Sequence, residues 1–267
     1  MRRSSIILLT TAALGAILLT GCGNAPGSVA GDPLAVKLVD AEKKMQGWGG
    51  VEMSMTFSGH GALSGRTLPC IAMTSSTEPA ETFTMDYVTS PDSSSGCSGS
   101  PDETVTIDYA DGTLYVTDPT DYSADGPKGC DVRITSHAVS ADLAEEFMGE
   151  QTSQTKMADL MKAATKISGD EHTITVAVDT AAMMKLGNTS IPAGADPDDI
   201  DVTAVAQLDD DGAMASLTMT IQAGDEGSLD IDTHYAKASA KPELPDSKCV
   251  TAGSPATSAD DIKGYLT

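Results

Sequence analysis

The sequence predicts an α+β fold in which one antiparallel sheet is covered on one face by helices. Apolar and polar residues alternate over many short segments, as in 51–57 and 105–109, which is the period of half-buried strands. Two other segments, 33–46 and 140–166, repeat apolar residues at helical spacing. A sheet packed beneath helices is the simplest architecture for this order of elements. No break in the pattern requires a second domain.

Residues 1–21 form a predicted targeting segment. Arg2 and Arg3 precede an apolar stretch from Ile6 to Leu19, which is shorter than a membrane-spanning helix needs. The stretch ends at Cys22, directly after a Leu-Thr-Gly sequence. The basic start and the apolar core predict a secretory signal. The string Leu19-Thr20-Gly21-Cys22 resembles the lipobox of bacterial lipoproteins, which implies cleavage before Cys22.

The first predicted elements of the mature chain are a tether and a helix. Residues 22–31 are mostly small and polar and predict a flexible tether. Asp32 as a cap and Pro33 in the first turn predict the start of a helix, and Gly47 predicts its end.

Three strands follow, with their apolar residues in alternating positions. They are predicted over 51–57, 83–87 and 105–109. Asp111-Gly112 then predicts a tight hairpin turn into a return strand that contains Leu114 and Val116.

The second half of the chain begins with helical spacing. Ser140 predicts a helix cap, Gly149 a break, and a second helical stretch continues to Ala164. A strand is predicted over 174–178, and Asp179 predicts the cap of a short helix that ends at Gly187. Residues 188–200 contain Pro and Gly and predict a surface loop.

Three more strands complete the predicted domain, which spans residues 32–236. They cover 202–208, 217–221 and 229–235, and Asp209–Gly212 predict the turn between the first two. Residues 237–267 show little periodicity and predict a peripheral tail.

Charge and cysteine usage restrict the functional classes. The net charge of the chain is −23, from 39 acidic and 16 basic residues, which argues against nucleic-acid binding. Four of the five cysteines follow Cys22, and an even number in an exported chain predicts two disulfides, for which three connectivities exist. We predict Cys70–Cys97, because this pair closes a local loop between sequential strands, and by elimination Cys130–Cys249.

No motif for catalysis, a cofactor or a metal stands out. The sequence lacks HExxH, GxSxG, GxGxxG and the P-loop pattern. Ser153–Lys156 fits SxxK without its companion motifs, and the acidic clusters at 196–201 and 209–211 do not fit a calcium loop. We therefore expect no enzyme activity, no cofactor and no metal.

Methionine is unusually frequent among the apolar residues. The chain has 13 Met against three Phe and one Trp. Unbranched thioethers fill cores, and they are also over-used on apolar surfaces that adapt to varied partners. The pattern therefore leaves two interpretations open, a filled core or a lipid-sized cavity.

Several strings of the sequence resemble the LppX/LprG-type lipoproteins of actinobacteria. They are LTGC at 19–22, the helix 33–46, VEMSMTF at 51–57, DGTLYV at 111–116, HTITVAVDTAAMMKLG at 172–187 and AVAQLDDDGAMASLTMTI at 204–221. The resemblance implies a LolA-like fold, a curved antiparallel half-barrel sheet with helices packed on its concave face. It also implies a diacylglycerol on the Cys22 thiol, and hence an anchor on the extracytoplasmic face of the cell membrane.

The resemblance further implies a ligand, a lipid or an acylated small molecule held in an apolar cavity without catalysis. Parity places the expected cavity residues on one strand wall and one helix wall. The strand wall consists of Met53, Met55, Phe57, Phe83 and Met85, and the helix wall of Met157, Leu160 and Met161. The alternative is a non-enzymatic envelope lipoprotein with a filled core, which acts through a protein partner or in signalling.

Overall fold

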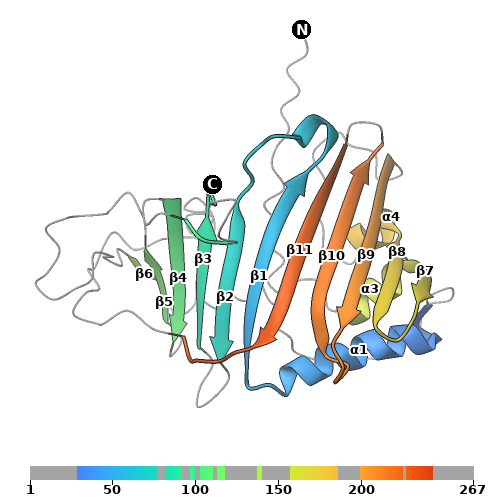
Figure 1. The fold of residues 1–267 in the computed structure, drawn as a ribbon, viewed down its shortest axis with the longest axis horizontal. Helices are drawn as coiled ribbons and strands as arrows, with labels where there is room; N and C mark the ends of the chain where they lie inside the picture. Colours follow the sequence, from blue (N-terminus) through green and yellow to red (C-terminus); the bar gives the residue numbers. More distant parts are fainter. Residues whose placement is uncertain are drawn as a thin grey trace, which may run out of the picture. The chain divides into compact units, whose positions relative to one another are not determined.

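The structure is a computed structural model, and it describes nine stretches of the chain. These are residues 29–76, 82–91, 97–99, 103–110, 113–117, 137–139, 157–185, 199–224 and 227–242. Within these stretches the fold is mostly β, with few and short helices. Eleven described strands form one sheet in the order β6-β5-β4-β3-β2-β1-β11-β10-β9-β8-β7, which has two ends and is therefore not closed (Figure 1). The antiparallel sheet is thus confirmed, whereas its curvature into a half-barrel stays a prediction.

The chain divides into two compact units. Unit 1 comprises residues 1–44, 59–65 and 151–231, and unit 2 comprises residues 45–58, 66–150 and 232–267. The prediction of a single domain over 32–236, with a signal, a tether and a tail outside it, remains a prediction.

Unit 2 is built around a meander of sequential strands. Each of the following strands pairs antiparallel with the next: β1 (Gly50–Gly59), β2 (Cys70–Ser76), β3 (Thr82–Val88), β4 (Thr104–Ala110), β5 (Thr113–Thr117) and β6 (His137–Val139). The predicted strands at 51–57, 83–87 and 105–109 and the β4–β5 hairpin are confirmed.

Unit 1 combines strands with the helices. Its elements are η1 (Val29–Gly31), α1 (Pro33–Gln46), η2 (Gly61–Leu63), α3 (Met157–Ala163), β7 (Ala164–Gly169), β8 (Thr173–Val178), α4 (Thr180–Lys185), β9 (Ile200–Leu208), β10 (Met214–Ala223) and the start of β11 (Gly227–Lys237). Helix α3 contacts α4 and η1, and α4 contacts β9. Helices therefore pack against the strands of this unit.

The predicted helix caps are confirmed by side-chain hydrogen bonds. The Asp32 carboxylate accepts from the Leu34 N–H at 2.9 Å at the start of α1. The Asp179 carboxylate accepts from the Ala182 N–H at 2.8 Å at the start of α4. In both helices the carboxylate satisfies an N–H group that has no partner within the helix.

Helix α1 runs across the turns of two hairpins (Figure 1). Lys37 pairs with Glu171 in the β7–β8 turn at 3.4 Å, and the Lys44 ammonium donates to the Asp211 carbonyl in the β9–β10 turn. Lys37 and Lys44 are seven residues apart, which is about 10.5 Å along a helix. The centres of the two adjacent hairpins are two strand spacings apart, each of about 4.8 Å. The spacing of the two lysines therefore fits the spacing of the two hairpins.

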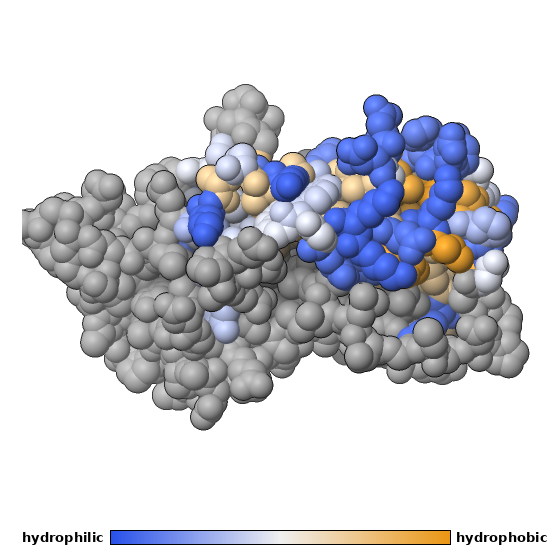
Figure 2. All heavy atoms as spheres, turned by 90° about the horizontal axis from the view of Figure 1, so that it is seen from below, coloured by the Kyte–Doolittle hydropathy of each residue, from blue (hydrophilic) through white to orange (hydrophobic). Residues whose placement is uncertain are grey.

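Seen from below, the coloured residues on the right of the view are mostly hydrophilic, with some hydrophobic ones between them (Figure 2). Among the described residues, Val36 of α1 is the one large hydrophobic residue that is exposed, at 48 %. No helix in the described stretches is long and apolar enough to cross a membrane.

The boundaries of α3 and β7 correct one prediction. We expected Ala164 to lie on a helix, but α3 ends at Ala163 and Ala164 begins β7. Met157, Leu160 and Ala164 recur at helical spacing, and a single apolar residue such as Ala164 is compatible with the end of a helix or the start of a strand. The sequence therefore did not show where α3 ends.

Strand β2 was not predicted either, since the small residue Ala72 separates its two large apolar side chains, Ile71 and Met73. The predicted elements at 140–149, Gly187, the loop residues 188–198 and the tail beyond 242 lie outside the described residues.

Candidate functional site

The apolar face of the unit 2 sheet carries a row of methionines. The strand register places Met53 opposite Met73, Met73 opposite Met85, and Met85 opposite Ile107. Directly opposed side chains in neighbouring strands lie close together on the same face. The four side chains are 4 %, 9 %, 1 % and 0 % exposed, so they form one continuous buried strip.

The neighbouring row on this face is equally apolar. Met55 lies opposite Ile71, Ile71 opposite Tyr87, and Tyr87 opposite Val105. All four are buried. Burial raises the pKa of the Tyr87 phenol above its usual value, so the phenol is neutral at physiological pH.

The third row of this face adds an aromatic pair. Phe83 lies opposite Tyr109 across β3 and β4, and the two rings stack with their centroids 5.5 Å apart. A stacked pair contributes about 0.5–1.5 kcal/mol beyond the burial of its area. The stacked pair therefore borders the methionine row on the same face of the sheet.

The structure places four of the five predicted strand-wall residues together. Met53, Met55, Phe83 and Met85 are buried on this face, whereas Phe57, near the end of β1, is partly exposed. Prediction by parity therefore placed four of the five residues correctly on the buried face. Phe57 lies beyond the last β1–β2 pair, Thr56 with Cys70, so no residue of β2 lies opposite it.

The predicted helix wall is buried in unit 1. Met157, Leu160 and Met161 are 6 %, 2 % and 2 % exposed. At the start of α3 the Met157 N–H donates to the buried carboxylate of Glu42 on α1, at 3.3 Å. This hydrogen bond links the two helices, because Glu42 supplies an acceptor to an N–H group that α3 itself leaves without one. That the two walls enclose one cavity stays a prediction.

Sequence reasoning missed the residues that complete the strand wall. Met73, Ile71 and Tyr87 lie on the same face as the predicted residues, and the first two belong to β2. The available signal was the alternation of Ile71 and Met73 with Ala72 and Thr74. It was weak because Ala and Thr are compatible with a loop as well as with a strand.

The cysteines give one confirmed prediction. Cys70, the first residue of β2, is bonded to Cys97, with their Cα atoms 5.5 Å apart. The Cys70 side chain is fully buried. Cys22, Cys130 and Cys249 lie outside the described residues, so the second disulfide and the lipidation remain predictions.

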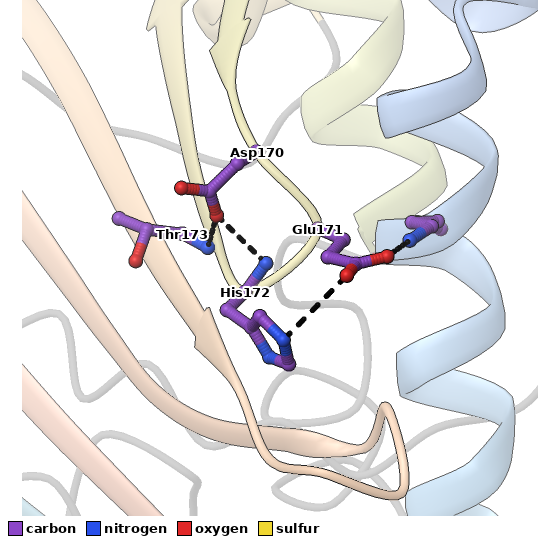
Figure 3. Close-up of polar contacts among 5 residues, drawn as sticks. Asp170, Glu171, His172 and Thr173 are labelled. Atoms are coloured by element: carbon purple, nitrogen blue, oxygen red, sulfur yellow. Dashed lines mark hydrogen bonds and ion pairs between the residues drawn. The ribbon is translucent and has the colours of Figure 1, made fainter.

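The hairpin turn between β7 and β8 gathers charged and polar groups in unit 1. One Asp170 carboxylate oxygen accepts from the N–H groups of His172 and Thr173, each at 2.9 Å (Figure 3). These bonds hold the pKa of Asp170 below its usual value, the His172 bond contributing most. Glu171, which follows Asp170 in the chain, lies within ion-pair distance of His172 and of Lys37. The arrangement shapes a turn and docks it on α1.

Metal ligands do not gather anywhere in the described part of the chain. No group of three or more His, Cys, Asp or Glu residues there is placed to hold a metal ion. The strips on the apolar face consist of thioether, hydrocarbon and aromatic groups. Such groups bind through contact area and shape rather than by bond making.

Comparison with known proteins gives matches of structure and none of sequence. No protein-family model matches the chain, and no curated protein matches it. The structure matches that of LprF from Mycobacterium bovis over 80 % of this chain and 97 % of that one, with a TM-score of 0.38 and 14 % identity. It also matches a putative outer membrane lipoprotein-sorting protein domain from Vibrio parahaemolyticus over 78 % and 95 %, with a TM-score of 0.23 and 10 % identity.

The two matches are to proteins of the class that the sequence resembles. LprF belongs with the LprG/LppX proteins, and the sorting domain is LolA-like. Both TM-scores lie below 0.5 and both identities below 25 %. The matches therefore carry no conclusion about what this chain binds.

Proposed function

We propose that this protein is a membrane-anchored lipoprotein of the bacterial cell envelope that binds or carries lipids or acylated molecules without catalysis. The observation that carries the proposal is the continuous methionine strip Met53–Met73–Met85 on one face of the sheet. Flexible, polarisable side chains adapt to acyl chains of varied shape, and each buried CH₂ group contributes about 0.8 kcal/mol to binding.

The anchor is supported by the sequence at the N-terminus. The apolar segment 6–19 is followed by the lipobox-like string that ends in Cys22. Two acyl chains on one residue give stable anchoring, where a single chain is marginal. Export directed by the proposed signal would place the folded chain on the extracytoplasmic face, and the small, polar stretch after Cys22 would tether it to the anchor.

Replacement of the anchoring residue tests the localisation. Cys22→Ser is expected to abolish labelling of the protein with an alkyne fatty acid in its host. It is also expected to release the protein from membranes or to leave it with an uncleaved signal. Labelling of the Ser variant at the level of the parent protein would contradict the proposed anchor.

Native mass spectrometry of the secreted chain, expressed in its own host, tests the ligand. We expect a lipid or an acylated molecule to co-purify with the protein. The burial of the strip is also what a filled core would give, so a parent protein without any adduct would favour the alternative, in which the protein acts through a protein partner.

An enlarged side chain distinguishes a cavity from a filled core. In a filled core Met161→Trp overpacks its surroundings and costs about 1–3 kcal/mol of unfolding free energy. In a roomy cavity we expect the same variant to keep its stability and to lose the co-purifying lipid. The matched control is Met161→Leu, which conserves volume and is expected to leave both readouts near those of the parent.

A further inference from the structure

The phenol of Tyr87 lies on the methionine face of the unit 2 sheet. Tyr87 is opposite Ile71 on one side and Val105 on the other, and Met85 precedes it by two residues on the same strand. Side chains on one face of a sheet stand roughly perpendicular to it, and a tyrosine is longer than the isoleucine and the valine beside it. The hydroxyl of Tyr87 therefore extends beyond these neighbours, away from the sheet.

The Tyr87 side chain is buried, but its hydroxyl has no hydrogen-bond partner among the described residues. Tyr87 is 6 % exposed. The side chains of Ile71, Val105 and Met85 carry no oxygen or nitrogen, and the carbonyls of these inner strands are used in strand pairing. Burial is the cause of the raised pKa of the phenol, and no hydrogen bond contributes to it. The sheet therefore offers this donor no acceptor.

Other hydroxyl groups of the same sheet have an acceptor within the protein. Ser75, on the same face as Tyr87, donates to the Val51 carbonyl at 3.3 Å. On the opposite face Thr84 donates to the Asp108 carboxylate at 2.8 Å. A buried hydroxyl that lacks an acceptor is unfavourable, so the exception at Tyr87 indicates an acceptor that is not part of the described chain.

Another group can reach the Tyr87 oxygen. Among the described side chains, Gln46 Nε2 is the one nitrogen or oxygen that is both completely enclosed and without a partner. The Tyr87 oxygen also lacks a partner, so it is not completely enclosed. An atom of a ligand can therefore approach it from the side that faces away from the sheet.

We propose that the Tyr87 hydroxyl donates a hydrogen bond to an ester carbonyl of a bound acyl lipid, whose chains lie along the methionine strip. The inference rests on the proposed lipid binding and adds the chemical class of the ligand. A carbonyl oxygen is the polar group at the start of an esterified acyl chain, and a neutral phenol is a suitable donor for it. A free fatty-acid carboxylate is disfavoured, because the chain has a net charge of −23 and the face around Tyr87 is apolar.

Two lipids that differ only at the carbonyl test the proposal. Dipalmitoylglycerol carries ester carbonyls, and dihexadecylglycerol has ether linkages in their place with chains of the same length. In titrations followed by native mass spectrometry, we expect the full mature chain to bind the ester about fivefold more tightly, the value of one neutral hydrogen bond. Equal binding of both lipids would overturn the ester contact and leave the proposed lipid binding in place. Binding of neither lipid would overturn both.

Removal of the hydroxyl identifies the donor. Tyr87→Phe keeps the ring and is expected to bind the ester about fivefold more weakly and the ether unchanged, so that the preference disappears. The matched control is Thr74→Val, which removes a hydroxyl from the opposite face of the neighbouring strand and is expected to keep the preference. A Tyr87→Phe protein that still prefers the ester, or an equal loss in the Thr74 variant, would overturn the role of Tyr87.

Palmitate distinguishes an ester from a carboxylate as the acceptor. We expect Tyr87→Phe to leave the affinity for palmitate unchanged. A loss of palmitate binding in this variant, with the affinity for dipalmitoylglycerol retained, would place a carboxylate at the phenol and overturn the ester assignment. Thermal unfolding without lipid is measured alongside at neutral pH. The midpoint of Tyr87→Phe is expected to stay near that of the parent, because the substitution removes no hydrogen bond to a described residue.

Discussion

The two units of the molecule hold their strands together by different means. In unit 1, hairpin turns are closed by aspartate side chains within a few residues of the turn, as in the bonds from Asp170 to the two amides that follow it. In unit 2, the start of β2 is bonded covalently to Cys97, 27 residues further along the chain. Order in unit 1 therefore depends on local turn chemistry, and order in unit 2 depends in addition on a long-range link.

The β9–β10 hairpin shows how local the control in unit 1 is. The Gly212 N–H donates to the Asp209 carbonyl at 2.9 Å, and the Asp209 carboxylate accepts from the Ala213 N–H at 2.8 Å. Gly212 has a φ of 73°, a conformation that a residue without Cβ adopts at low cost. All of these groups lie within five consecutive residues.

The largest expected effect on stability is in unit 2, when its disulfide is removed. The chain-entropy model predicts that Cys97→Ser lowers the unfolding free energy by about 3–4 kcal/mol for a loop of this length. Denaturant unfolding measures it, and the parent protein under reducing conditions is the control. Unchanged unfolding of both samples would mean that the link does not stabilise unit 2.

A smaller effect is expected from the helix cap in unit 1. Asp179→Ala removes the acceptor for the Ala182 N–H and is expected to cost about 1 kcal/mol. Thermal or denaturant unfolding gives the value, and Asp179→Asn, which retains an acceptor, is expected to stay near the parent. If Asn and Ala cost the same, the cap would not be the cause.

Alkaline unfolding provides a third comparison, because a titrating phenol lies on the apolar face of unit 2. Burial raises the pKa of Tyr87 in the folded chain, so its contribution to stability is complete below the usual value of 10.0 and declines as the pH rises above it. Tyr87→Phe is expected to reduce the loss of stability at high pH. Identical alkaline profiles for the variant and the parent would argue against a buried neutral phenol.

The smallest effect is expected at the exposed β7–β8 turn. Because the pKa of Asp170 is lowered, its contribution is present above the usual value of 3.8 and is lost as the pH falls through the lower folded value. The amide NMR signals of His172 and Thr173 are expected to shift in that acidic range. In Asp170→Ala both shifts should vanish, and their persistence would assign the titration to another group.

The local elements were predictable because their signals lie within a few residues. Side chains that bond to nearby backbone groups define several of these elements. They are the helix from Pro33 with its Asp32 cap, the Asp179 cap and the turn at 209–212. The strand faces followed from alternation, which is why Met53 and Met85 were correctly placed on one wall. The Cys70–Cys97 bond also followed from chain order, since it closes a loop of 27 residues between the start of β2 and the chain between β3 and β4.

The features that the sequence did not predict depend on how the strands pair in the sheet. Strand β2 has few large apolar residues, so its place between β1 and β3 shows only in the pairing of Met73 with Met53 and Met85. The boundary at Ala164 was decided by the pairing of β7 with β8, which a helical period cannot reveal. The pairing of β11 (Gly227–Lys237) with β1 (Gly50–Gly59) was likewise not predictable, because these neighbouring strands lie far apart in the sequence.

The sequence alone thus determined the elements, their caps and turns, and the polarity of each strand face, because these depend on periodicity and on contacts between near neighbours. Only the tertiary structure decided which residues become neighbours across strands. It brought three methionines into one buried row and placed Ala72 between Ser54 and Asp86 on the opposite face. The physical reason is that the backbone hydrogen bonds that pair two strands are the same for every residue type except proline, so the identity of the neighbouring strand leaves little trace in the sequence.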